Sequence, residues 1–303
     1  MKIAIIGLGR MGMQIAKRLH NNGFEVAAWN RSEMPRKEFE ESGGKTYENI
    51  DELLTFFGNE SKVVWVMLPA DTVEDFLFGS VDLIHKLSAG DYLIEGGNSF
   101  YKDSVRRAAE FEAKGIHFYD CGVSGGVWGE RNGFALMTGG SKEHFSFIEP
   151  ILKTLSSGEN YGLVGKSGAG NFVKMVHNGI EYGMMEAIAE GYAVMKASPF
   201  ELDLLQVTKV YQQGSVVKSW LIDLMRNIYE KEDIEGTVGL VRATGEGLWT
   251  VEAAKELGVD ARVIEASLKV REESLDPKTH GDYRNKLLAL LRNQFGGHAV
   301  DKK

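Results

Sequence analysis

The chain has 303 residues, of which 43% are hydrophobic and 26% charged, so two domains and an ordinary globular composition are expected. Its formal net charge of −8 at pH 7 argues against broad nucleic-acid binding, which needs a basic face. It has a single cysteine, Cys121, no apolar run as long as a membrane span, and an amino terminus that enters a strand directly, so we expect a cytoplasmic protein without a disulfide or a membrane segment.

Short apolar runs alternate with helical periodicity through the first half of the chain. Strands are expected over residues 2–7, 25–30, 62–68, 91–97 and 116–120, with further candidates at 134–138 and 159–164. Helices are expected near residues 10–22, 33–43, 71–87 and 101–114. This alternation predicts a parallel sheet with right-handed crossovers. Because only long helical periodicities follow Gly170, we expect an α/β domain over residues 1–165 and an all-α domain with a carboxyl-terminal tail over residues 166–303.

The first expected strand runs into GLGRMG, which places Gly7, Gly9 and Gly12 in a G-x-G-x-x-G spacing. A plain strand–helix turn is the alternative. However, the motif follows a strand and opens a helix, and this context predicts the dinucleotide-binding turn of a Rossmann-type domain. The glycines there let a pyrophosphate approach the amino terminus of the helix. The residues of the turn expected to contact the cofactor are Gly7, Leu8, Gly9, Arg10, Met11 and Gly12. Leu68 and Asn98, at the ends of later expected strands, are expected to contact it as well.

The end of the second expected strand indicates which dinucleotide is bound. An acidic residue about 20 positions after the glycines would bind the 2′-hydroxyl of NAD. The chain has Asn30, Arg31 and Ser32 there, so no carboxylate repels a 2′-phosphate, and Arg31 and Ser32 can bind one. This favours NADP as the cofactor, with NAD as the alternative and Arg31 as an ordinary surface cation if the interpretation is wrong.

The segment FVKMVHNGIEYGMMEAI, residues 172–188, predicts a helix with two stripes of different character. The stripe expected to face a core consists of Val173, Val176, Ile180, Met184 and Ile188. The polar stripe, at positions i, i+3, i+4 and i+7, consists of Lys174, His177, Asn178 and Glu181. Burying such groups without partners costs several kcal/mol. The polar stripe is therefore either a set of mutually satisfied groups, such as a Lys174–Glu181 ion pair, or a functional site.

Three further stretches carry a resemblance to a known family. They are EGGNS (95–99), GVSGGVWGERNGFALMTGG (122–140) and KMVHNGIEY (174–182). With the amino-terminal glycines, they resemble the β-hydroxyacid dehydrogenases. KMVHNGIEY narrows the resemblance to the decarboxylating 6-phosphogluconate dehydrogenases, since 3-hydroxyisobutyrate dehydrogenases usually lack GIEY. The resemblance covers essentially the whole chain and is to the short form of the family, which lacks a second helical repeat.

The resemblance implies oxidation and decarboxylation of 6-phosphogluconate to ribulose 5-phosphate and carbon dioxide, with reduction of NADP. It implies Lys174 as general base and then acid at the C3 oxygen, and Glu181 as the acid that protonates C1. The residues implied in binding this phosphorylated sugar acid are Asn98, Ser124, Gly125, Gly126, His177, Asn178, Tyr182, Thr250, Arg271, Arg292 and His298. No metal is expected, because β-decarboxylation needs none and no metal-ligand spacing to Cys, Asp or Glu is found at His20, His85, His117, His144 or His280.

Two departures from the family pattern concern the substrate site. Leu248 stands where members usually have Lys or Arg, and Arg242 is a candidate replacement; Asn171 stands where a histidine is common. Arg262 fits the phosphate site less well than Arg271.

The tail RNQFGGHAV, which contains Arg292 and His298, reaches a neighbouring subunit in the longer enzymes, so a homodimer or homotetramer is expected. The alternative functions are another β-hydroxyacid dehydrogenase, of 3-hydroxyisobutyrate or glyoxylate-reductase type, and a non-catalytic Rossmann protein that senses the cofactor ratio.

Overall fold

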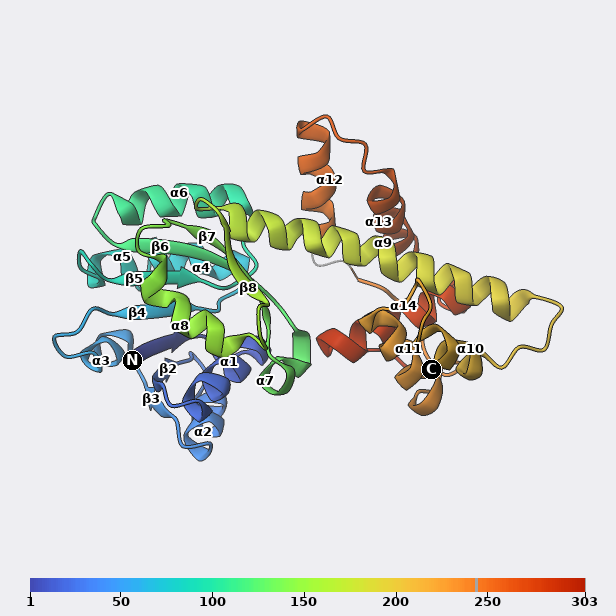
Figure 1. Cartoon of the computed structure of the whole chain (residues 1–303), viewed down its shortest axis with the longest axis horizontal. Coiled ribbons are helices and arrows are strands. Elements are labelled where there is room, and N and C mark those ends of the chain that lie inside the picture. Colours follow the sequence, from blue (N-terminus) through green and yellow to red (C-terminus); the bar gives the residue numbers. More distant parts are fainter. Residues whose placement is uncertain (243–244, 303) are drawn as a thin grey trace. The chain divides into compact units, whose positions relative to one another are not determined.

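A computed structural model describes residues 1–242 and 245–302 of the chain (Figure 1). The chain divides into two compact units, Met1–Lys174 and Met175–Lys303. One helix, α9 (Ala169–Ala197), contains residues of both units. Each unit has its own hydrophobic core, so each is described in turn.

The first unit is built on an eight-stranded sheet with strand order β3-β2-β1-β4-β5-β6-β7-β8. The strands are β1 (Lys2–Ile6), β2 (Glu25–Trp29), β3 (Lys45–Tyr47), β4 (Val63–Val66), β5 (Tyr92–Glu95), β6 (His117–Ser124), β7 (Ala135–Gly140) and β8 (Tyr161–Gly165). The order reverses at β1, as in nucleotide-binding α/β folds. The predicted α/β fold is therefore confirmed. One pairing differs from the expected parallel sheet, because β6 and β7 run antiparallel. The short connection between them, residues 125–134, carries no crossover helix of the length that a parallel pair needs.

The helices of the first unit cover both faces of this sheet (Figure 1). They are α1 (Arg10–Asn21), α2 (Glu33–Glu41), α3 (Ile50–Thr55), α4 (Ala70–Phe78), α5 (Leu83–Lys86), α6 (Tyr101–Glu112), α7 (Gly129–Asn132) and α8 (Phe145–Leu155). The single helix expected over 71–87 is two, α4 and α5, because the chain leaves helical geometry at Gly79. Elements β3, α3, α7 and α8 were not among the expected ones.

Alternation along the central strand divides the core of the first unit into two layers. Ile3 and Ile5 belong to one buried cluster, which also contains Phe39 of α2. Ala4 and Ile6 belong to the other, on the face covered by α3 to α6. Both faces of β1 are apolar because a parallel sheet is buried on both sides.

The second unit is helical, as predicted. Besides the rest of α9 it contains α10 (Leu204–Tyr211), α11 (Trp220–Lys231), α12 (Glu246–Glu256), α13 (Arg262–Glu273) and α14 (Tyr283–Gly296). The tail after α14 folds back on this unit, where the Val238 N–H donates to the Asp301 carbonyl at 2.9 Å. In the described part of the chain, no helix combines the length and the apolar character needed to cross a membrane.

Most of the apolar stripe expected to face the core on α9 is exposed instead, although Val176 is half-buried and Ile188 packs against the core of the second unit. Ile180 and Met184 are 53% and 41% exposed. The buried face carries Tyr182, Met185 and Tyr192, at most 4% exposed. The prediction was wrong because α9 has two apolar stripes, and periodicity does not say which of them meets the other helices.

Candidate functional site

The glycine turn after β1 has a shape that two of its glycines make possible. Gly7 has φ 98°, and its N–H donates to the Trp29 carbonyl at 2.8 Å. A Cβ on Gly7 would lie 2.6 Å from the Met67 carbonyl oxygen, and a Cβ on Gly12 would overlap the Gly7 carbonyl oxygen. Substitution of either glycine therefore changes the turn that joins β1 to α1.

The middle glycine is not required by the protein itself. Gly9 is the N-cap of α1, and a Cβ there would have no protein atom within 4 Å. The first turn of α1 contains no acidic residue, so the positive end of the helix dipole is not offset by a carboxylate. The exposed Gly9 and Arg10 lie beside it, and Leu8 and Met11 complete the turn. An open backbone at a helix amino terminus fits the approach of a pyrophosphate.

The loop after β2 holds its predicted cofactor residues in different ways. The Asn30 side chain accepts the Leu8 N–H at 3.0 Å, so it shapes the glycine turn. Arg31 and Ser32 are exposed at the start of α2. The Ser32 hydroxyl, at the N-cap of α2, does not cap the helix. Arg36 of α2 donates to the Asn30 carbonyl at 2.8 Å. Arg36 was missed by the sequence reasoning, although its position one helical turn after Ser32 could have indicated it.

The ends of β4 and β5 come together at the same edge of the sheet. A Cβ on Gly97 would overlap the Leu68 carbonyl oxygen, which explains the second glycine of EGGNS. Leu68 is partly buried, and Asn98 is exposed at this carboxyl-terminal edge. Ligands of open α/β sheets bind at this edge.

A buried polar network that was not predicted consists of Glu95, Ser99, Ser104 and Arg107. Glu95, 1% exposed, accepts from the Ser99 hydroxyl at 2.8 Å and from the Ser104 hydroxyl at 2.6 Å. It also forms an ion pair with Arg107, which is 2% exposed. A buried carboxylate needs such partners, so the network keeps the EGGNS segment in one conformation.

The segment Ser124–Gly126 begins with the last residue of β6 and continues in left-handed backbone geometry, with φ 145° at Gly125 and 55° at Gly126. Gln14 of α1 ties this segment to the nucleotide turn. Its side-chain amide donates to the Gly126 carbonyl at 3.3 Å and accepts the Glu130 N–H at 3.0 Å. The helix that begins at the glycine turn therefore also supports the predicted substrate segment.

The polar stripe of α9 is partly buried. Lys174, at the end of the first unit, is 8% exposed. In the second unit, His177 Nδ1 lies 3.0 Å from Asn178 Oδ1 and 4.0 Å from Glu181 Oε2. The His177 and Glu181 side chains are 38% and 23% exposed. These three side chains form a connected group that remains accessible to a ligand.

Two predicted phosphate ligands are buried cations of the second unit. Arg271 is 3% exposed and Arg292 is 7% exposed. The Arg271 guanidinium lies 3.2 Å from the centre of the Tyr182 ring, and its hydrogen-bond acceptor is the Met185 sulfur at 3.7 Å. The Arg271 pKa is lowered to about 10, mainly by burial and in part by the nearby Arg292 charge, and burial also lowers the Arg292 pKa. Buried cations near each other favour an anion, and guanidinium groups bind phosphate well.

The remaining predicted residues differ in how available they are. The Thr250 hydroxyl, 5% exposed, donates to the carbonyls of Met175 and Glu246 at 2.8 and 2.9 Å. His298 lies in the tail, where its carbonyl accepts from the Asn293 amide at 2.8 Å. Arg242 is exposed, and its charge contributes to the lowered Arg292 pKa. Leu248, the departure on α12, is 44% exposed. Arg262 is 82% exposed and paired with Asp260, as a surface arginine would be.

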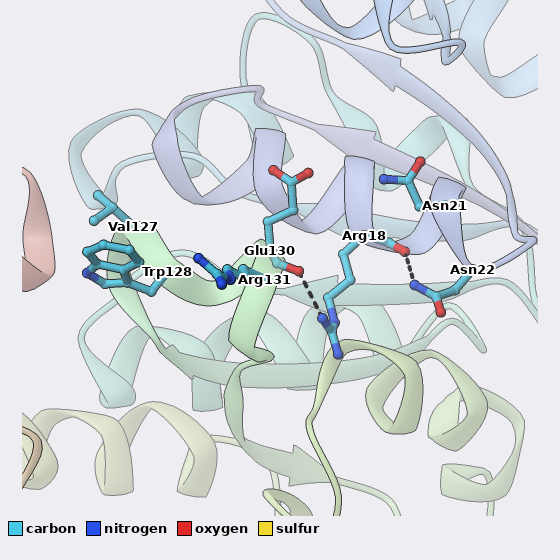
Figure 2. Close-up of a pocket in the computed structure, with 7 residues that line it drawn as sticks. All are labelled: Arg18, Asn21, Asn22, Val127, Trp128, Glu130 and Arg131. Carbon is cyan, nitrogen blue, oxygen red and sulfur yellow. Dashed lines mark hydrogen bonds between the residues drawn. The ribbon is translucent and has the colours of Figure 1, made fainter.

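A cavity of about 280 Å³ lies elsewhere in the first unit, beside the carboxyl end of α1 and α7 (Figure 2). It is lined by Arg18, Asn21, Asn22, Val127, Trp128, Glu130 and Arg131, none of which is a predicted site residue. Figure 2 shows the Arg18 guanidinium against the Glu130 carbonyl, to which it donates at 2.9 Å. Arg18 also donates to the Thr154 and Ser156 carbonyls, which makes it a structural clamp. Within the described residues, no group of three or more His, Cys, Asp or Glu is placed to hold a metal ion.

Comparisons with known proteins cover both units. The model of the NAD binding domain of 6-phosphogluconate dehydrogenase matches residues 2–165, and that of the 6-phosphogluconate dehydrogenase C-terminal domain matches residues 170–302. YqeC of Bacillus subtilis, provisionally named a 6-phosphogluconate dehydrogenase, is 39% identical over 304 residues, 100% of both chains. The NAD(+)-dependent, decarboxylating 6-phosphogluconate dehydrogenase of Haloferax volcanii is 34% identical over 306 residues, 100% of this chain and 99% of that one.

A solved structure extends the comparison. Plasmodium falciparum 6-phosphogluconate dehydrogenase, determined alone, with NADP+ and with 6-phosphogluconate, is similar with a TM-score of 0.82 and 29% identity. The similarity covers 97% of this chain and 71% of that one.

Proposed function

The chain belongs to the 6-phosphogluconate dehydrogenase family, and from this premise we propose that it oxidises and decarboxylates 6-phosphogluconate to ribulose 5-phosphate and carbon dioxide. The observation that carries the proposal is the buried pair Arg271 and Arg292, which are 3% and 7% exposed. They lie close enough for the Arg292 charge to lower the Arg271 pKa. Two desolvated guanidinium groups are a costly arrangement without an anion. Against the effect of burial, the Glu181 charge raises the pKa of both arginines, and a terminal phosphate would add two further negative charges and acceptor oxygens.

The reaction needs two proton-transfer groups, and α9 supplies both in this proposal. Lys174 takes the proton of the C3 hydroxyl while hydride leaves C3, and it returns that proton to the C3 oxygen as carbon dioxide is lost. Glu181 then donates a proton to the carbon that lost carbon dioxide, which is C2 of 6-phosphogluconate and becomes C1 of ribulose 5-phosphate. The two residues stand seven positions apart, which corresponds to about 10 Å along a helix axis and suits opposite ends of a small substrate. His177 and Asn178 orient the substrate between them.

A nicotinamide dinucleotide, when bound, would supply the hydride acceptor, and we propose NADP in this role. The open backbone at Gly9 would hold the pyrophosphate. Arg31, Ser32 and Arg36 would bind the 2′-phosphate, because they bring two cations and a hydroxyl to the end of β2 without a carboxylate at Asn30–Ser32. The NAD(+)-dependent name of the Haloferax volcanii relative makes a direct comparison of the two cofactors necessary.

One assay tests the reaction and the cofactor together. The purified protein is incubated with 6-phosphogluconate and either NADP or NAD, while reduced cofactor and released carbon dioxide are both followed. We expect equal amounts of the two products and a clear preference for NADP. Absence of cofactor reduction contradicts the proposed function, and reduction without carbon dioxide indicates a simple hydroxyacid dehydrogenase. A preference for NAD contradicts the role given to Arg31.

Variants on α9 assign the proton transfers. Lys174→Met should abolish reduction, while Lys196→Met, which removes an exposed lysine of the same helix, should not. Glu181→Gln should slow turnover strongly, and the control Glu190→Gln, also exposed on α9, should leave it within twofold. A 3-hydroxyisobutyrate-type enzyme does not need Glu181, so an unaffected Glu181→Gln variant would favour that alternative.

The exposed stripe of α9 supports a homodimer or homotetramer. Ile180, Met184 and Val194 are 53%, 41% and 71% exposed and lie at helical spacing. Such a continuous apolar face is typical of a subunit interface, and a second copy would cover it. Sedimentation velocity should give a dimer or larger species for the natural chain and a smaller one for Val194→Asp. A natural chain that stays monomeric would contradict this part of the proposal.

A further inference from the structure

Asp120 links the sheet to the first turn of α9. It is fully buried on β6, where it stands opposite Glu95 of β5 and Gly139 of β7. Its carboxylate accepts two backbone N–H groups, that of Gly168 at 2.6 Å and that of Asn171 at 2.7 Å. Both donors belong to the start of α9, where a helix leaves N–H groups without intrahelical partners. One side chain of the sheet therefore satisfies two of these donors and holds the helix end in place.

Glycines bring the same helix turn into direct contact with the strands. A Cβ on Gly170 would overlap the Asp120 carbonyl oxygen and lie 2.5 Å from the Met137 carbonyl oxygen. A Cβ on Gly122 would overlap the Lys174 Cβ and lie 3.0 Å from the Gly170 carbonyl oxygen. Gly122 is two residues after Asp120, so both are on the same face of β6. The stem of Lys174 therefore packs against the strand at a position where only glycine leaves room.

A second set of hydrogen bonds, made by the Asn171 side chain, holds the first turn of α9. The Asn171 side-chain amide donates to the Ser104 hydroxyl at 2.8 Å and to Glu95 Oε2 at 3.4 Å. Ser104 belongs to α6 and Glu95 to β5, so the buried polar network is also hydrogen-bonded to the first turn of α9. Asn171 precedes Lys174 by three positions, which places it one turn before Lys174 on the helix.

We propose that Asp120 is a positioning residue that sets the register of α9 on β6 and thereby the place of Lys174 relative to Ser124. Ser124 is on the same face of β6 as Asp120 and Gly122, four positions after Asp120. The carboxylate thus holds the helix that carries the proposed proton acceptor against the middle of β6, whose carboxyl-terminal end leads into the substrate segment. This inference rests on the proposed role of Lys174 as the base.

Asp120→Asn tests the carboxylate. An amide has one acceptor oxygen, so its NH2 group would face one of the two backbone donors and the helix end would shift. Because displacement of a reacting group by about 1 Å can cost up to a hundredfold in rate, we expect kcat to fall about 10- to 100-fold. The KM for NADP should stay within twofold, and the pH at which kcat is half-maximal should move, because a displaced Lys174 has different burial.

The matched control is Asp91→Asn. Asp91 is also buried, 3% exposed, and its carboxylate accepts the Lys62 and Ser88 N–H groups, each at 2.8 Å. It directly precedes β5 and so lies at the amino-terminal ends of the strands, whereas the proposed site lies at their carboxyl-terminal ends. Loss of this carboxylate should lower the melting temperature as Asp120→Asn does, but it should leave kcat and its pH dependence unchanged.

Gly122→Ala tests the same inference without changing a charge, and it decides the question if Asp120→Asn does not fold. The added methyl group would displace Lys174, so kcat should again fall at least tenfold. Its control is Gly162→Ala on β8, where a Cβ would have no atom within 4 Å and kcat should be kept. An active natural enzyme whose folded Asp120→Asn and Gly122→Ala variants keep kcat within twofold of their controls would overturn the inference. An inactive natural enzyme would instead contradict the proposed function.

Discussion

Replacement of Arg271 by methionine should weaken substrate binding and stabilise the ligand-free protein. Arg271 is 3% exposed, and burial, the largest cause, lowers its pKa from 12.5 to about 10. Since each pKa unit corresponds to about 1.4 kcal/mol, the ligand-free fold bears roughly 3 kcal/mol for keeping this guanidinium charged. Methionine has a similar shape and no charge, so this cost disappears. The contact with the Tyr182 ring is lost as well, which costs about 2 kcal/mol for a desolvated cation.

The net gain in the free energy of unfolding is therefore about 1 kcal/mol, or roughly 2–4 °C in melting temperature. The same change removes the proposed charge-assisted contact to the substrate phosphate, worth about 3 kcal/mol, so the KM for 6-phosphogluconate should rise roughly a hundredfold. The assays are thermal unfolding without ligand and initial rates over a range of 6-phosphogluconate at saturating NADP. Inorganic phosphate should raise the melting temperature of the natural protein and not that of the variant.

Arg262→Met is the matched control on the same helix, α13. Arg262 is 82% exposed and paired with Asp260, so its loss should leave the KM within twofold and the melting temperature within about 1 °C. An Arg271→Met variant with a melting temperature several degrees below that of the natural protein would show that the guanidinium stabilises the fold, and would refute the reasoning. So would an unchanged KM.

Three further predictions concern other groups. Gly9→Ala should leave the melting temperature unchanged, because a Cβ there meets no protein atom, but calorimetry should give a Kd for NADP at least tenfold higher; equal binding would mean that the pyrophosphate lies elsewhere. Arg31→Ala should raise the KM for NADP about tenfold and leave that for NAD within twofold in steady-state assays, and a parallel change in both would contradict recognition of the 2′-phosphate. Burial raises the Glu186 pKa from 4.5 to about 7, against the opposing charge of Arg284, whose Nε lies 3.3 Å away. Because the folded state then holds this proton more tightly than the unfolded state, the stability from Glu186 is complete below pH 4.5 and is lost as the pH rises toward 7. Urea unfolding should therefore show that Glu186→Gln is more stable than the natural protein at pH 8, by up to about 3 kcal/mol, and a variant that is less stable at pH 8 would contradict this.

The parts of the protein that could be predicted from sequence depend on local geometry. The glycine turn is an example, because Gly7 has a positive φ and a Cβ on Gly12 would overlap the Gly7 carbonyl oxygen within the same turn. The α/β and all-α halves could be predicted because strand and helix periodicities are properties of short segments. The common orientation of Lys174, His177, Asn178 and Glu181 follows from helix geometry alone.

The remaining features depend on which surfaces meet, and short segments carry no information about that. Periodicity did not show that α9 buries Tyr182 and Met185 and exposes Ile180, because both stripes are apolar. It also did not show that β7 would run antiparallel to β6. The proximity of Arg271 and Arg292, from two different helices, results from packing within the second unit.

The polar stripe of α9 shows most clearly which features the sequence determines and which depend on tertiary structure. The sequence determined that Lys174 belongs to this stripe, because the position of a residue along a helix fixes the direction in which its side chain points. Only the tertiary structure determined where the helix itself is held, because Asp120, 48 positions before Gly168, reaches it through a hydrogen bond of 2.6 Å. Side chains far apart in the chain meet only after the sheet has formed, and their meeting decides where Lys174 is placed.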